Sequence, residues 1–268
     1  YGAATSTSIV QLLIAGIMPA LLYTGILMLT VAWLAYRYNH PRSSRWPTFR
    51  EIWAAFLPAL PALLAPVLLV GGMLAGLFTP TEAASITVAY ILLITVFFYG
   101  GITWERLRFA LFDTVKTTSA VLIIVSAAGL FGWVMAIEQL PQIFTRALLS
   151  LSTDPVVLLL IVNVLLLIAG MFIDSTTATL LIAPLVIAPL TMAGVDPVHL
   201  GIIFVFNLMI GLLTPPMGLG LFLLSHIAGI SMWAVLRAVL PFYIPLLVSL
   251  IIITFWPDLS LWLPKMMR

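Results

Sequence analysis

Two interruptions in otherwise apolar stretches hold the residues of this chain best suited to bind an ion or a small anion. The first, Gly170-Met-Phe-Ile-Asp-Ser-Thr-Thr177, places one carboxylate directly before three hydroxyl groups. The second, Gly211-Leu-Leu-Thr-Pro-Pro-Met-Gly-Leu-Gly220, contains two prolines, which lack an amide hydrogen and disfavour a helical conformation in the preceding residue. Carbonyl oxygens freed at such breaks can bind sodium, and the positive end of the following helix can face a carboxylate. Together the breaks predict a site for a cation and an organic anion.

Each interruption also has a structural interpretation. The two prolines could form a kink that only serves packing, and Asp174 could be an ordinary loop carboxylate at a membrane surface. Ionisable groups inside membrane segments are rare and point to function by default. The glycines that flank the two prolines favour a functional break, so we prefer the binding interpretation at both places.

Other chemistry has little support in the sequence. The chain has no cysteine, which excludes disulfides, thiol catalysis and cysteine-ligated metal. His199 and His226 are isolated and lack metal-ligand spacing, so they are interpreted as interfacial or packing residues, and no metal other than sodium and no cofactor is expected. Thr79 and Glu82 have the spacing of a helix N-cap. No catalytic residue is predicted.

The elements that position the two breaks must be membrane helices. Hydrophobic residues make up 63% of the chain and charged residues 7%, with a mean hydropathy of +1.23, whereas soluble domains have about 25% charged residues. A membrane helix needs about 20 apolar residues, which allows roughly six to eight membrane segments here. Val156–Val162 runs apolar without the alternation of a barrel strand. The sequence predicts an all-α polytopic membrane protein in a lipid bilayer, and the net charge of +2 gives no reason to expect nucleic acid.

Basic residues set the expected topology, because positive loops favour the cytoplasm. One cluster lies between Arg37 and Arg50 and includes Arg42, and the other lies between Arg106 and Lys116. Two crossings, at 61–79 and 83–99, would connect these clusters, and 117–137 would then lead outward. The later segments would be a re-entrant hairpin at 155–192, a broken helix at 198–227 and an exit at 241–256, which leaves Arg268 outside. Two full crossings at 155–192 would satisfy the topology equally.

A faint internal repeat completes the organisation. Ser8 and Ser231 each begin a short amphipathic stretch that ends at Pro19 and Pro241 respectively and runs into an apolar span. The expected topology places the two copies on opposite sides of the membrane, as in the inverted repeats of secondary transporters. Residues 1–50 would then end a first repeat, with an interfacial helix, a membrane helix and a basic cytoplasmic loop, and 51–268 would form the second. The counterpart of the proline break would lie before Tyr1, so the chain is expected to be a fragment that lacks most of the first half.

Four ordered motifs resemble the C-terminal part of the large, DctM-like membrane subunit of tripartite ATP-independent periplasmic (TRAP) transporters. The resemblance covers essentially the whole chain. Its motifs are Gly71-Gly-Met-Leu-Ala-Gly-Leu-Phe-Thr-Pro-Thr-Glu-Ala83, Gly170-Met-Phe-Ile-Asp174, Gly194-Val-Asp-Pro-Val-His-Leu-Gly201 and Leu212-Leu-Thr-Pro-Pro-Met-Gly-Leu219.

The resemblance implies an ion-transporter-type elevator fold that imports a small carboxylate, such as a C4-dicarboxylate or sialic acid, with sodium as coupling ion. It also implies a small four-helix membrane subunit, a periplasmic substrate-binding protein and a place in the bacterial or archaeal cytoplasmic (inner) membrane. By motif, sodium would bind at Gly170, Gly211, Thr214 and Met217, mainly through backbone carbonyls and the hydroxyl of Thr214. The substrate would lie near Asp174, Ser175, Thr176, Thr177, Pro215, Pro216 and Gly218.

Three other functions are compatible with the residues. One is a sodium/anion symporter or efflux permease of the same broad class that works without a binding protein. Another is an intramembrane enzyme, for which Asp174 and His226 are the candidate pair, although no protease or transferase motif surrounds them. The third is a scaffold subunit that does not transport.

Overall fold

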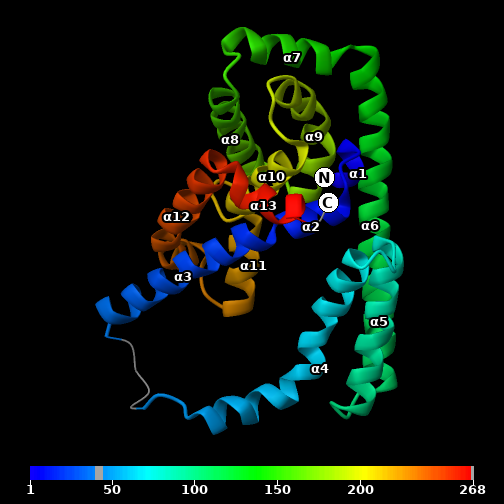
Figure 1. Ribbon diagram of the computed structural model, residues 1–268, viewed down its shortest axis with the longest axis vertical. Helices are drawn as coiled ribbons and strands as arrows, with labels where there is room; N and C mark the ends of the chain where they lie inside the picture. The colour runs from blue at the N-terminus through cyan, green and yellow to red at the C-terminus, as the bar shows by residue number, and fades with distance from the viewer. Residues whose placement is uncertain (40–44, 267–268) are drawn as a thin grey trace. The chain divides into compact units, whose positions relative to one another are not determined.

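The computed structural model describes residues 1–39 and 45–266, and all regular secondary structure in these ranges is helical (Figure 1). This confirms the prediction of an all-α polytopic membrane protein. Arg42 of the predicted basic loop and Arg268 lie outside the described residues. Within the described residues, seven helical stretches are long and apolar enough to cross a membrane: Ile9–Arg37, Phe49–Leu74, Pro80–Phe97, Trp104–Ile137, Pro155–Phe172, Ser175–Met192 and Met232–Phe255.

The chain divides into two compact units. One comprises residues Tyr1–Tyr38 and Leu122–Arg268, and the other comprises Asn39–Val121. The second unit contains α4 (Phe49–Leu74), α5 (Pro80–Phe97) and the first half of α6 (Trp104–Ile137), and α4 packs against α5. Both interruptions with candidate binding residues lie in the first unit.

Helix α4 begins at Phe49, twelve residues before the start expected for this crossing. Three prolines, Pro58, Pro61 and Pro66, lie inside the helix without ending it. Two tyrosines, one in α5 and one just after it, bind carbonyls of this proline-rich stretch. The hydroxyl of Tyr90 donates to the Pro61 carbonyl at 2.8 Å, and that of Tyr99, which follows the end of α5 at Phe97, donates to the Pro58 carbonyl at 2.7 Å. Proline in a membrane helix is tolerated where neighbouring side chains satisfy the backbone.

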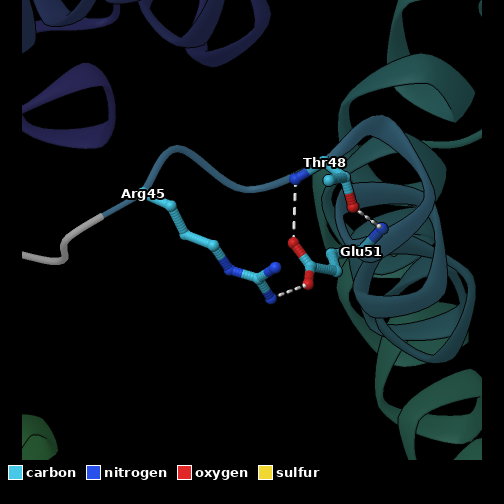
Figure 2. Close-up of polar contacts among 3 residues, drawn as sticks. All are labelled: Arg45, Thr48 and Glu51. Carbon is cyan, nitrogen blue, oxygen red and sulfur yellow. Dashed lines mark hydrogen bonds and ion pairs between the residues drawn. The ribbon is translucent and has the colours of Figure 1, made fainter.

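Capping boxes define where α4 and α5 begin. In α4 the Thr48 amide donates to Glu51 at 2.8 Å and the Glu51 amide donates to the Thr48 hydroxyl at 3.4 Å, while Arg45 pairs with Glu51 at 2.5 Å (Figure 2). In α5 the Thr79 amide donates to Glu82 at 2.8 Å and the Glu82 amide donates back at 3.4 Å. The predicted N-cap at Thr79 is therefore confirmed. Each box satisfies amide groups that have no partner inside the helix.

The first unit is built around four helices that surround one buried core. Helices α8 (Pro155–Phe172), α9 (Ser175–Met192), α10 (Pro197–Leu212) and α12 (Met232–Phe255) contribute most of the buried side chains. Figure 1 shows α8 in green and α10 in yellow within this unit, and these two helices pack against each other. The remaining helices of the unit are α1 (Gly2–Thr5), α2 (Ile9–Ala15), α3 (Ile17–Arg37), the end of α6, α7 (Leu140–Leu151), α11 (Leu219–Ala228) and α13 (Pro257–Met266).

The two members of the predicted repeat begin as expected but continue differently. Ser8 caps α2 by accepting from the amide of Gln11, and Ser231 caps α12 by accepting from the amide of Ala234, both at 3.4 Å. Helix α12 then runs unbroken through Pro241, so the predicted start of a separate span at residue 241 was wrong. A proline inside a helix removes one donor but need not end the helix when packing supports it.

Candidate functional site

The first interruption is a tight turn between α8 and α9. Helix α8 ends at Phe172 and α9 begins at Ser175, so the turn falls inside the hairpin expected at 155–192. Asp174 is the N-cap of α9, and its carboxylate accepts from the amides of Thr176 at 2.9 Å and Thr177 at 3.2 Å, and from the hydroxyl of Thr177. Asp174 therefore occupies the positive end of α9 itself, where the sequence suggested that an anion could lie.

A small cavity lies beside the first turn of α9. It has a volume of about 240 Å³, and Ser175, Thr176 and Thr179 bring hydroxyl groups to its wall. Thr179 donates its hydroxyl to the Ser175 carbonyl at 2.6 Å, whereas Ser175 and Thr176 follow the capping residue directly. The other lining residues are Tyr1, Leu180, Val205, Leu208 and Met209. Hydroxyl groups on an apolar wall can orient a small polar solute.

The second interruption separates α10 from α11, as the two prolines predicted. Helix α10 ends at Leu212 and α11 begins at Leu219. In a continuous helix the Gly211 carbonyl would accept from residue 215, but Pro215 has no amide hydrogen. The amide of Thr214 binds the Gly211 carbonyl instead, at 2.8 Å, and the hydroxyl of Thr214 donates to the Ile210 carbonyl at 2.8 Å. The amide and the hydroxyl of Thr214 thus satisfy two carbonyls at the end of α10 in place of the regular helical hydrogen bonds.

The two interruptions meet through backbone contact at a pair of glycines. A Cβ atom placed on Gly170 would lie 3.1 Å from the Cα of Gly211, and one placed on Gly211 would lie 2.6 Å from the Cα of Gly170. The amide of Met217 also donates to the Met171 carbonyl at 3.3 Å, which joins the two breaks directly. The structure therefore brings the neighbourhoods of Gly170, Gly211 and Met217 together, with Thr214 in the same break.

At this meeting point the Thr214 hydroxyl keeps capacity to accept a further partner, whereas the Gly211 carbonyl already has two donors. A carbonyl oxygen has two lone pairs and a hydroxyl oxygen can accept as well as donate. The Gly211 carbonyl accepts from the amides of Leu213 and Thr214, and the Thr214 hydroxyl acts as a donor. Sodium is a hard cation that favours such neutral oxygens. In the ranges 1–39 and 45–266, no group of three or more His, Cys, Asp and Glu residues is placed to hold a metal ion.

Tyr243 is a residue of this region that the sequence did not single out. Its hydroxyl donates to the Leu213 carbonyl in the α10–α11 break. A cavity of about 420 Å³ lies between the break and α12, and Tyr243 and Thr214 are the members of its wall with hydroxyl groups. The signal in the sequence is a phenol two residues after Pro241 in an apolar helix, but its partner is 30 positions away. The remaining lining residues are Leu167, Met171, Ile210, Pro215, Leu236, Leu240 and Leu247.

A buried polar chain next to the site also escaped the sequence analysis. Asn207 of α10 donates to the side-chain oxygen of Asn163 in α8 at 2.7 Å, and Asn163 donates to the Thr254 hydroxyl in α12 at 2.9 Å. All three side chains are buried. Together with the glycine contact, the Asn163–Asn207 pair shows that α8 and α10 run parallel and reach the meeting point from the same end. The signal in the sequence that could have revealed this chain is the pair of side-chain amides, Asn163 and Asn207, in otherwise apolar segments.

Comparison with known proteins identifies the family of this chain. Residues 1–259 match the family described as "Tripartite ATP-independent periplasmic transporter, DctM component". The chain is 38% identical to a sialic acid TRAP transporter large permease protein of Vibrio cholerae, over 99% of this chain and 62% of that protein. It is 39% identical to a C4-dicarboxylate TRAP transporter large permease protein of Pseudomonas aeruginosa, again over 99% and 62%.

A 2,3-diketo-L-gulonate TRAP transporter large permease protein of Escherichia coli is 36% identical, over 97% of this chain and 61% of that protein. The chain therefore spans about three fifths of the length of these three curated relatives. The family is one of transport proteins, so the interpretation as an intramembrane enzyme, with Asp174 and His226 as its pair, is not supported. The family match covers almost every residue, and this chain belongs to the DctM component family of tripartite ATP-independent periplasmic transporters.

Proposed function

We propose that this chain forms the C-terminal part of a large permease subunit that imports a small organic anion with sodium across the bacterial inner membrane. The observation that carries the proposal is the contact between the two breaks, where Gly170 meets Gly211 and Met217 binds Met171. Irregular backbone at membrane depth is tolerated where it is buried in protein or lines a cavity, and transporters use such places to bind ions. Thr214 and the neighbouring carbonyls supply neutral oxygen ligands for sodium.

The same contact supports a hairpin turn that lies inside the bilayer. Helices α8 and α10 run parallel, and α10 continues beyond the break into α11, which has a further 10 residues. If the α10–α11 segment crosses the membrane, the turn at Asp174 lies inside the bilayer, about 15 Å of helix short of the far end of α11. This supports a re-entrant hairpin at 155–192 over two full crossings, although each 18-residue arm is long and apolar enough to cross by itself.

The substrate is proposed to be a carboxylate. The three relatives named above carry sialic acid, a C4-dicarboxylate and 2,3-diketo-L-gulonate in their names, and these compounds share a carboxylate group. Ser175 and Thr176 carry hydroxyl groups at the start of α9, Thr177 binds the Asp174 cap with its own hydroxyl, and Pro215, Pro216 and Gly218 lie in the facing break. Asp174 takes part as the cap that fixes these groups, since its carboxylate already binds the helix end.

The family also supports two proposed partners: a small membrane subunit and a periplasmic protein that delivers the anion. Transport would follow an elevator motion in which the hairpin and the broken helix move as one body. A symporter or efflux permease without a binding protein is the competing proposal. It predicts uptake that does not depend on an added binding protein.

The test is uptake by proteoliposomes that contain the full-length gene product and its small subunit. Accumulation of a labelled carboxylate should require both an inward sodium gradient and the cognate binding protein. Liposomes with an equal potassium gradient provide the control for ionic strength and osmotic effects. Accumulation that is independent of sodium would contradict the coupling mechanism, and accumulation without the binding protein would favour the competing permease.

A further inference from the structure

We infer that Tyr243 is a positioning residue that holds the α10–α11 break in its ion-binding geometry, an inference that rests on the proposed function. The first observation is the hydrogen bond from the Tyr243 hydroxyl to the Leu213 carbonyl. In a continuous helix this carbonyl would accept from the amide of Met217. That amide instead binds the Met171 carbonyl in the other break, at 3.3 Å. The phenol therefore replaces a backbone donor that has been used to join the two breaks.

The peptide group held by Tyr243 is central to the proposed sodium site. The Leu213 carbonyl and the Thr214 amide belong to one planar peptide unit. Tyr243 binds its oxygen, and the Gly211 carbonyl binds its N–H at 2.8 Å. Rotation of this peptide plane would move the Thr214 N–H, which binds the Gly211 carbonyl, together with the Thr214 side chain. Since both residues are proposed ligands, the orientation of the peptide unit sets the positions of both ligand oxygens.

The residues around Tyr243 offer the Leu213–Thr214 peptide unit few other hydrogen-bond donors. The phenol ring forms part of the wall of the 420 Å³ cavity, and the rest of that wall is mostly leucine, isoleucine, methionine and proline. Apolar side chains cannot donate to the Leu213 carbonyl. Removal of the hydroxyl therefore leaves this carbonyl without its donor while the ring continues to fill the same space.

The variant Tyr243→Phe tests this role in the full-length gene product with its partner proteins. Tyr90→Phe is the matched control, because the Tyr90 hydroxyl also donates to a helix carbonyl, that of Pro61, at 2.8 Å in the other unit. Sodium titrations of uptake should give a half-saturating concentration about three- to tenfold higher for Tyr243→Phe. The maximal rate at saturating sodium should stay within about twofold, and Tyr90→Phe should keep the wild-type sodium dependence.

A second measurement separates positioning from stability. The shift in melting temperature on adding sodium to the purified protein reports binding directly, because a ligand of the folded state stabilises it by mass action. Tyr243→Phe should need more sodium for the same shift. A lowered rate at every sodium concentration with an unchanged half-saturating concentration would overturn the inference, and so would wild-type behaviour in both assays. If the wild-type protein itself responds to sodium in neither assay, the proposed sodium coupling fails and the inference fails with it.

Discussion

The Cα atom of Gly170 lies so close to Gly211 that a methyl group on Gly211 would approach it to 2.6 Å. Real Cβ atoms essentially never come so near to backbone, so this contact requires glycine at position 211. It brings α8 and α10 together at the point where α8 turns into α9 and α10 breaks. Every proposed role of the region depends on this approach, which makes it the first feature to test.

Replacement of Gly211 by alanine should separate the two breaks. Overpacking a close contact costs about 1–3 kcal/mol, so the melting temperature of the purified protein should fall and its sodium-dependent increase should disappear. Gly25→Ala is the matched control, because a Cβ atom there meets nothing within 4 Å. Equal melting temperatures for the two variants would contradict the packing argument.

Replacement of Thr214 by alanine should weaken sodium binding by removing one oxygen ligand. If this ligand contributes about 1.4 kcal/mol to the free energy of sodium binding, its loss raises the sodium concentration for half-maximal uptake about tenfold. Thr214→Ser keeps the hydroxyl and should stay near the wild type. An unchanged sodium dependence in Thr214→Ala would remove this residue from the proposed ligands.

Asp174 can be tested as a helix cap against a similar residue in the same unit. Asp154 caps α8 by accepting from the amides of Val156 at 2.8 Å and Val157 at 3.3 Å, much as Asp174 caps α9. Alanine at either position should cost about 0.5–2 kcal/mol of stability, whereas serine, which also caps well, should cost less. Thermal unfolding measures both changes. Capping fails as the main role of Asp174 if serine and alanine at this position are equally destabilising.

The buried amides should behave as one unit in a double-mutant cycle. Asn207→Leu leaves the Asn163 oxygen buried without its donor, which costs about 1–3 kcal/mol. Asn163→Leu should have a comparable cost, and the double variant should lose less than the sum of the two. The unfolding free energies of the four proteins provide the test, and strict additivity would show that the two residues act independently.

The features that the sequence predicted correctly are those set by local chemistry. The break before α11 follows from two missing amide donors at Pro215 and Pro216, and the start of α5 follows from the spacing of Thr79 and Glu82. Apolar length was enough to predict a helical membrane protein. None of these predictions required knowledge of which helices touch.

The features that the sequence missed depend on partners far along the chain. Membrane segments were expected to begin at Pro61 and Pro241, yet both prolines lie inside longer helices, α4 and α12, because packing outweighs a single lost hydrogen bond. Tyr243 and Asn207 were overlooked because their partners, Leu213 and Asn163, lie 30 and 44 positions away. One apolar helix can present a polar residue to several neighbours, and the sequence does not specify which neighbour it meets.

The link between Met217 and Met171 is made by main-chain atoms alone. Ordinary substitutions at either position leave the amide donor and the carbonyl acceptor in place, so the two segments can stay joined while their side chains vary freely. Among the natural amino acids, proline at position 217 is the replacement that abolishes the donor. The attachment of hairpin to broken helix is therefore encoded in backbone geometry, and residues 171 and 217 are free to adapt to whatever surrounds them.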